Sequence, residues 1–414
     1  VVACEMTKWF NTNYHYIVPE LEGVEPKVTK NRPLAFYREA KEKLGIEGKP
    51  VILGPITFLK LAKGYEQKQF DSLLEQFVPL YAEILQELEA EGAEWVQLDE
   101  PVLVTTSSVD DVERFRKVYD QLHKAAPNLK LLLQTYFEGI DQYEEIVRLP
   151  VQGIGLDFVH DDGENSASLK KYGFPEDKVL AAGVIDGRNI WRADLAEKSK
   201  LVKEISETVP SERLIIQPSS SLLHVPVTTE NESDLGAVLK DALAFADEKL
   251  QEVVVLTEGV SVGWASVEQK VKESSRAVRE LNESFSRNIE DVREAIANLA
   301  NIRAERGVPY NERQKLQNER FGLPILPTTS IGSLPQTPEV RKARRDWRKG
   351  EWDDDKYDRY VKDKIKTWID IQEKIGLDVL IHGEFERNDM VEYFGEKLGG
   401  FTTTQNAWVQ SYGS

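Results

Sequence analysis

Two segments in the last third of the chain carry residue types suited to binding an amino acid. Ile331-Gly332-Ser333 reads as a glycine turn, and Glu384 follows a short apolar run. Backbone N–H groups of such a turn, with the hydroxyl of Ser333, can bind a carboxylate. Glu384 can pair with an ammonium group. Because an amino acid carries both groups, we interpret the two segments as a receptor for a zwitterion. The alternative is an ordinary turn and an ordinary strand end.

A third segment is dense in aromatic side chains. It runs from Thr7 through Lys8 and Trp9 to Tyr16. Aromatic rings can stack on a flat heterocycle, and Lys8 could meet the acidic tail of such a ligand. The alternative is a barrel strand and its loop, with the aromatic side chains packed against the core.

Short apolar runs that alternate with long amphipathic stretches would position these residues. The runs cover residues 50–54, 95–99, 129–134, 153–157, 179–184 and 214–217. Helical patterns such as 70–91 and 109–125 lie between them. Continuously apolar strands are buried on both faces, which is typical of a parallel sheet. We predict an α/β fold and favour a TIM-type βα barrel, with an open sheet as the alternative.

Active sites of parallel α/β domains lie at the carboxyl ends of the strands. Asp99 and Glu100 form an adjacent acid pair at one such end, and paired carboxylates are typical of glycoside hydrolysis. Adjacent strand residues point to opposite sides, so we favour strand capping and loop hydrogen bonding for this pair. The rule nominates six polar residues in all: Asp99, Glu100, Gln134, Asp157, Asp186 and Gln217.

The histidines and the cysteine of this chain do not have the number or spacing typical of metal ligands. No two of the five histidines have the spacing of ligands on one helix face. His160-Asp161-Asp162 could hold a hard cation or form a solvated loop. Cys4 is the single cysteine, so a disulfide framework and a multi-cysteine metal site within this chain are excluded. We expect Cys4 to be a small buried residue, and we expect a cytoplasmic protein.

Composition narrows the classes of partner. The 414 residues suffice for two or three domains, and a net charge of −18 argues against a general nucleic-acid or membrane-surface binder. The chain opens at Val1 without Met and closes in a loop-like Gln410–Ser414 segment. We therefore expect a fragment, truncated at both ends.

The second half of the chain predicts a different organisation. Residues 264–306 are heavily charged and helical in pattern, typical of helices between two domains. A second α/β unit follows, with strands at 326–331 and 378–382 and helix between 338 and 376. The expected division is an N-terminal barrel at 1–263, a helical linker at 264–323 and the start of a second barrel at 324–414.

Several long segments, in this order, resemble those of the cobalamin-independent methionine synthase family. Besides the Ile331 and Glu384 segments, these are residues 5–16, 97–101, 156–159, 183–191 and 217–222. The resemblance implies two similar βα barrels. It also implies methyl transfer from 5-methyltetrahydropteroyltri-L-glutamate to L-homocysteine, with a zinc-activated thiolate as nucleophile and without cobalamin.

The resemblance also implies roles for individual residues. Ile331, Gly332, Ser333 and Glu384 would bind homocysteine, and Lys8 would bind the folate. The zinc ligands and the catalytic proton donor of the family have no counterpart here, so we expect no catalytic residue and no metal ligand in this chain. We expect a monomer that binds these small molecules, without nucleic acid or membrane. The alternative is a non-catalytic module that binds polyglutamyl folate.

Overall fold

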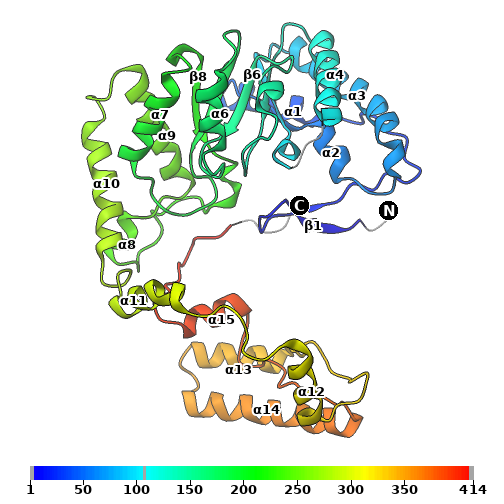
Figure 1. Cartoon of the computed structure of the whole chain (residues 1–414), viewed down its shortest axis with the longest axis vertical. Helices are drawn as coiled ribbons and strands as arrows, with labels where there is room; N and C mark the ends of the chain where they lie inside the picture. Colours follow the sequence, from blue (N-terminus) through cyan, green and yellow to red (C-terminus); the bar gives the residue numbers. More distant parts are fainter. Residues whose placement is uncertain (1–3, 106–108, 410–414) are drawn as a thin grey trace. The chain divides into compact units, whose positions relative to one another are not determined.

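The computed structural model describes residues 4–105 and 109–409, and the two chain ends on which the expectation of a fragment rested lie outside these ranges. The chain divides into two compact units. The first comprises Val1–Glu283 with Thr404–Ser414, and the second comprises Ser284–Thr403. Each unit is described by itself below (Figure 1).

A six-stranded parallel sheet forms the centre of the first unit. Its strands stand in chain order, so that each strand pairs with the next one along the sequence. They are β3 (Val51–Leu53), β4 (Trp95–Asp99), β5 (Lys130–Gln134), β6 (Gly153–Asp157), β7 (Val179–Ile185) and β8 (Leu214–Pro218). Each coincides with one of the six predicted apolar runs to within two residues.

The strand order favours one class of parallel fold. A doubly wound sheet reverses its strand order at a switch point, whereas this sheet runs from β3 to β8 without reversal. All five residues of β6 are buried, as expected for a strand covered on both faces. The predicted parallel α/β sheet is therefore confirmed, and closure into a barrel stays a prediction.

Helices connect successive strands and supply most of the remaining core. Helix α3 (Phe70–Ala90) is typical: it buries Leu74, Phe77 and Leu85, which share one face at helical spacing. The other helices of this unit are α1 (Arg32–Leu44), α2 (Pro55–Leu61), α4 (Val109–Ala125), α5 (Tyr143–Ile146), α6 (Glu164–Tyr172), α7 (Leu195–Ser206), α8 (Ala237–Asp241), α9 (Ala246–Ser261) and α10 (Glu268–Glu283). Short 3₁₀ helices are η1 (Gln67–Gln69), η2 (Pro101–Val104), η3 (Ser211–Arg213) and η4 (Leu222–His224).

The aromatic segment near the start of the chain forms a hairpin of its own. Strands β1 (Met6–Lys8) and β2 (His15–Ile17) pair antiparallel and form a sheet separate from the six parallel strands. A barrel strand at this position is therefore not observed. The hairpin leaves Cys4 exposed, so the expected burial of this cysteine is wrong.

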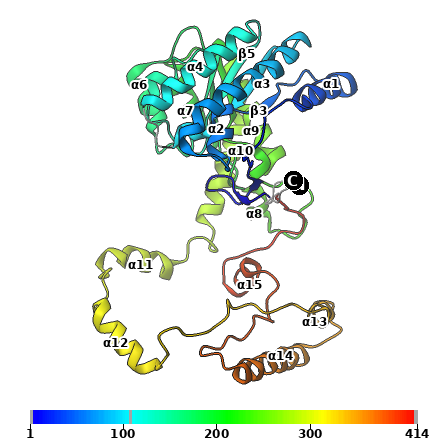
Figure 2. The same cartoon turned by 90° about the vertical axis from the view of Figure 1, so that its right-hand side faces the viewer.

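The second unit is helical. It contains α11 (Glu290–Asn298), η5 (Leu299–Asn301), α12 (Tyr310–Phe321), α13 (Pro338–Arg348), α14 (Asp354–Ile375) and α15 (Met390–Lys397). Helices α13 and α14 lie side by side (Figure 2) and bury Val340, Ala343 and Val361 between them. Helices α11 and α12 bury no residue. Across both units, no helix that the structure describes is long and apolar enough to cross a membrane.

The two strands predicted in the second unit are not formed. The segments around 328 and 379 run together through bonds such as Val379 N–H to the Thr328 carbonyl, and Ser333 and Gly383 form one parallel bridge. Two parallel segments without a third strand or a covering apolar layer do not sustain a regular ladder. Ile331 is fully exposed, consistent with the missing layer. Helix α10 lies within the residues expected to form the linker. In the structure it is part of the first unit.

Candidate functional sites

The acid pair after β4 splits into two different environments. Glu100 is completely buried and accepts hydrogen bonds from the backbone N–H of Thr57 at 2.7 Å and of Ile56 at 3.2 Å, at the start of α2. A side-chain Cβ on Gly54 would collide with this carboxylate, so glycine is required there. Burial raises the pKa of Glu100 to about 7. Glu100 thus caps the start of α2 from a buried position, a role that differs from the strand capping favoured from sequence.

The remaining strand-end residues form hydrogen-bond networks across the sheet. Gln217 donates to the Gln134 side chain at 2.8 Å. Asp157 is fully buried and accepts from the backbone N–H of Val159 at 2.7 Å, and its Oδ2 lies 3.1 Å from His160 Nδ1. The other ring nitrogen of His160 lies 3.5 Å from Asp186. His160 therefore joins two carboxylates, which sequence reasoning had kept apart.

This cluster holds His160 in its charged form. Hydrogen bonds to Asp157 and Asp186 raise the pKa of His160 to about 9. Burial alone would raise the pKa of Asp186, but hydrogen bonds from His160 and from the backbone N–H groups of Arg188 and Asn189 hold it below its usual value. The Asp157–His160–Asp186 cluster fixes the loop after β7 to the loop after β6.

We expect the cluster to stabilise the fold in a pH-dependent manner. The pKa of His160 lies near 9 in the folded chain, against 6.5 for the ordinary side chain. The stabilisation is therefore complete below about pH 6.5 and is lost as the pH rises through about 9. In urea titrations across this range, the free energy of unfolding of wild type should exceed that of His160→Asn by about 1–3 kcal/mol at the acidic end. His123→Asn is the matched control, because His123 contacts the amide of Gln152. A difference between wild type and His160→Asn that does not change with pH would contradict the expectation.

An aromatic pocket opens at the same end of the sheet. Its volume is about 410 Å³, and its lining includes Trp9, Tyr14 and Tyr16 from the hairpin, Tyr136 after β5, and His224. Asp99 also lines it, and burial raises the pKa of that carboxyl to about 6. The pocket pairs aromatic walls with one carboxyl group. Such a combination suits a flat heterocycle with N–H donors.

Two strained aromatic residues stand beside this pocket. Phe10 and Phe137 have φ of 51° and 88°, a region that residues with a side chain rarely adopt. Their ring centroids lie 6.0 Å apart, and the Arg188 guanidinium lies 4.8 Å from the Phe137 ring centroid. Strain of this kind clusters at functional sites. Arg188 was not singled out from sequence, although it lies within the 183–191 segment that carried the resemblance.

Lys8 lies at the end of β1, directly before Trp9. Its side chain is exposed and contacts no partner among the residues that the structure describes. Lys8 is thus an exposed cation at the turn end of the hairpin whose aromatic residues line the pocket.

In the second unit, the structure brings the predicted amino-acid receptor together. Gly332 has φ of 141°, and a Cβ on it would lie only 3.2 Å from Glu384 Oε1. The bridge between Ser333 and Gly383 holds the two segments in register. The N–H groups of Gly332 and Ser333 have no hydrogen-bond partner among the described residues. Ile331 is fully exposed and could contribute only its backbone.

Two arginines contact the segments of this predicted receptor, and neither was given a role from sequence. Arg387 donates from Nε to Glu384 Oε2 at 2.9 Å. Arg344 is 6% exposed and donates to the carbonyls of Phe385 and Arg387, each at 2.8 Å. It thereby fixes the loop that carries Glu384. Arg387 follows Glu384 by three residues, a spacing that could have suggested the ion pair.

The described residues do not fit a metal centre. Residues 4–105 and 109–409 contain no group of three or more His, Cys, Asp or Glu side chains that could hold an ion. At His160-Asp161-Asp162, Asp161 instead accepts from the backbone N–H of Asn165 at 2.8 Å, at the start of α6.

The sequence of the chain matches two models of one protein family. Residues 1–210 match the model described as "Cobalamin-independent synthase, N-terminal domain", and residues 326–414 match "Cobalamin-independent synthase, Catalytic domain". The chain belongs to the cobalamin-independent methionine synthase family. The resemblance inferred from the motifs is confirmed.

Curated relatives of this family share high identity along the whole chain. A protein of Listeria monocytogenes is 58% identical over 413 residues, and one of Bacillus velezensis is 54% identical over 414. Both are named 5-methyltetrahydropteroyltriglutamate–homocysteine methyltransferase, and each match covers all of this chain and 54% of the relative. The chain thus spans about half the length of these relatives. A B12-independent methionine synthase structure from a Shewanella species aligns with a TM-score of 0.44 at 17% identity, over 65% of this chain and 75% of that one; a likeness this weak adds nothing.

Proposed function

We propose that the protein carrying this sequence transfers the methyl group of 5-methyltetrahydropteroyltri-L-glutamate to L-homocysteine, forming L-methionine without cobalamin. One observation carries the proposal: relatives that bear the name of this activity are 58% and 54% identical to the chain over its whole length. A protein of the relatives' length that carries this sequence should form methionine from the two substrates with no cobalamin added. Failure to do so in the presence of zinc would overturn the proposal.

The two units would hold different substrates. The aromatic pocket and Lys8 in the first unit suit a flat heterocycle with an acidic tail. In the second unit, Gly332 and Ser333 offer N–H donors beside the Glu384 carboxylate, which suits the two charges of homocysteine. Small molecules are therefore the proposed partners of a monomeric, cytoplasmic protein. The acidic charge of the chain argues against nucleic acid and membrane surfaces.

Zinc would supply one piece of chemistry, which is to lower the pKa of the homocysteine thiol. The described residues offer no ligand set for it, so we assign no zinc-dependent step to them. Their proposed task is to bind and orient. Glu384 and the Gly332 turn would fix the amino-acid end of homocysteine and leave its thiol free.

A second candidate is a non-catalytic module that binds polyglutamyl folate. The aromatic pocket favours it. The two candidates differ in their need for homocysteine. A binding module would hold the folate but would not respond to homocysteine, whereas the methyltransferase would consume both.

Replacing Lys8 with Ala should weaken binding of the polyglutamate tail of the folate. An exposed single contact is worth about 1 kcal/mol or less, and more where it is partly desolvated. In a protein of the relatives' length, Lys8→Ala should therefore raise KM for the triglutamate substrate by up to about fivefold, and for the monoglutamate by less. Lys30→Ala, at another exposed lysine of the first unit, is the matched control. Equal effects of Lys8→Ala on both substrates would make Lys8 a purely structural residue.

A further inference from the structure

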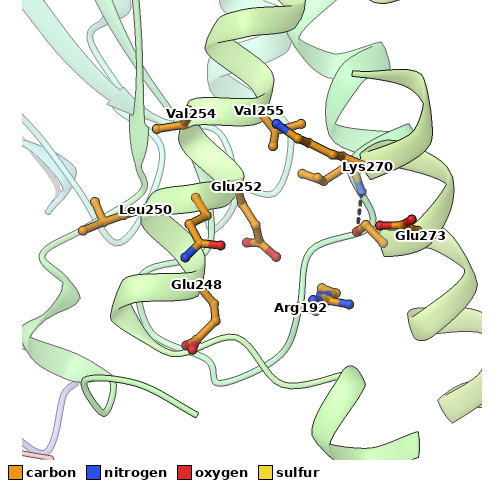
Figure 3. Close-up of a pocket in the computed structure, with 11 residues that line it drawn as sticks. Arg192, Glu248, Leu250, Glu252, Val254, Val255, Lys270 and Glu273 are labelled. Carbon is orange, nitrogen blue, oxygen red and sulfur yellow. Dashed lines mark hydrogen bonds between the residues drawn. The ribbon is translucent and has the colours of Figure 1, made fainter. Parts of the chain in front are cut away.

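A second cavity lies in the first unit. It is a groove of about 470 Å³ between α9 and α10. Figure 3 shows Glu252 projecting from α9 toward Arg192, with Lys270 and Glu273 on α10 across the groove. No residue of this groove belongs to the aromatic pocket or to the Glu384 receptor. Its charges therefore need a separate explanation.

Most charged groups around the groove already have partners. Lys270 lies 3.5 Å from Glu258, and Glu273 accepts from the Gln269 amide at 2.8 Å. Glu248 is occupied by hydrogen bonds from Thr228, Thr229 and the backbone N–H of Phe245. Each of these groups therefore has at least one partner within the protein.

Glu252, in contrast to the other acidic residues of the groove, is buried and has one carboxylate oxygen without a hydrogen-bond partner among the described residues. Its side chain is 6% exposed, and Oε1 accepts from the backbone N–H of Ala193 at 2.9 Å. Oε2 is buried without a hydrogen-bond partner among the described residues. Burial raises the pKa of Glu252 to about 7, against the opposing effect of Lys249 and Arg192. An unsatisfied buried carboxylate oxygen is costly, so a donor that reached it would be bound favourably.

Arg192 is the exception among the bases. Its guanidinium donates to no residue that the structure describes, although it offers five N–H groups. Nearby Lys249 cannot substitute for it, because its ammonium is buried and donates to Asn189 and to the Trp191 carbonyl. The groove thus combines one unused acceptor and one unused set of donors, of opposite charge.

This pairing selects the class of ligand. A simple cation would be repelled by Arg192 and Lys249, and a simple anion by Glu252. A molecule with both charges satisfies both groups at once. We propose that the groove between α9 and α10 binds a free α-amino acid with an apolar side chain, its ammonium paired with Glu252 and its carboxylate with Arg192.

The apolar residues that line the groove explain why the proposed ligand has an apolar side chain. Leu195, Val255, Leu250 and Val254 line the groove, and the last two are 50% and 61% exposed. An aliphatic side chain laid against them would remove apolar surface from water. The volume lies within the range of small-molecule sites and exceeds what one amino acid fills.

Binding of L-leucine to the 414-residue chain, measured by calorimetry and saturation-transfer NMR, tests this assignment. Leucine should bind, and isoamylamine and isovalerate, which each lack one charge, should bind at least about tenfold more weakly. Glu252→Gln and Arg192→Gln should each weaken leucine by at least about tenfold. Asp247→Asn, at an exposed acid of the same helix outside the groove lining, should leave the affinity unchanged.

Two further comparisons separate binding at this groove from binding elsewhere and from loss of folding. Glu384→Gln should not change leucine binding, which separates this groove from the receptor of the second unit. Arg192→Gln removes a side chain without hydrogen-bond partners among the described residues, so it should fold even if Glu252→Gln does not. The assignment is overturned if leucine does not bind, if it binds equally to Arg192→Gln, or if the amine or the acid alone binds as tightly as leucine.

Discussion

Glu384→Gln should weaken homocysteine binding by about 2–5 kcal/mol in a protein of the relatives' length, because the ligand ammonium is left without its charged partner. Glutamine keeps the shape of the side chain beside Gly332, where a Cβ would approach Glu384 Oε1 to 3.2 Å. The substitution therefore keeps the size of the side chain and removes its negative charge. Calorimetric titration with homocysteine measures the loss. Folate affinity should change little, because the folate residues proposed here lie in the first unit.

The ion pair with Arg387 sharpens this test. Glu384 already holds Arg387 at 2.9 Å, so the variant also frees a cation that would repel the ligand ammonium. Glu392→Gln is the matched control, because Glu392 pairs with Arg348 in the same unit. If Glu384→Gln binds homocysteine as wild type does, Glu384 serves only to hold Arg387, and the receptor proposal fails.

The 414-residue chain alone should form no detectable methionine, which is the largest effect we expect. A catalytic zinc needs three or more protein ligands, and the described residues contain no such group. The assay supplies zinc, homocysteine and methylated triglutamyl folate to this chain, beside a protein of the relatives' length as positive control. Turnover comparable with that control would contradict the expectation.

Zinc binding provides an independent readout of the same expectation. Competition with a chromogenic chelator should show no tight zinc site in the 414-residue chain, whereas the positive control should retain one. A stoichiometric tight site in the chain would mean that ligands outside the described ranges, or assembled from several copies, had been overlooked.

The parallel sheet could be predicted from sequence because its signal is local. A strand covered on both faces must be apolar along its whole length, and runs such as 95–99 and 153–157 show this directly. Helix α4 was predicted with its observed bounds, since the amphipathic pattern from Val109 to Ala125 is unbroken.

The same reasoning failed where a strand depends on neighbours. The apolar run 378–382 resembles a strand, but in the structure it meets only the segment around 328 and forms no ladder. The segment from Thr7 to Tyr16 was considered as a barrel strand with its loop. In the structure it folds back on itself as an antiparallel hairpin. In both cases the missing information was which segment lies alongside, and this is not encoded in the run itself.

The family and the parallel α/β class could be inferred from sequence, because motif identity and apolar periodicity are properties of short segments. The assignment of Gly332, Ser333 and Glu384 to homocysteine stays a prediction. Tertiary structure alone decided that Glu100 caps a helix, that His160 joins Asp157 to Asp186, and that Arg387 pairs with Glu384. It also decided that Arg192 and Glu252 share a groove while their neighbours are already paired. These outcomes depend on distances between loops and on burial, and both arise only when elements far apart in the chain pack together.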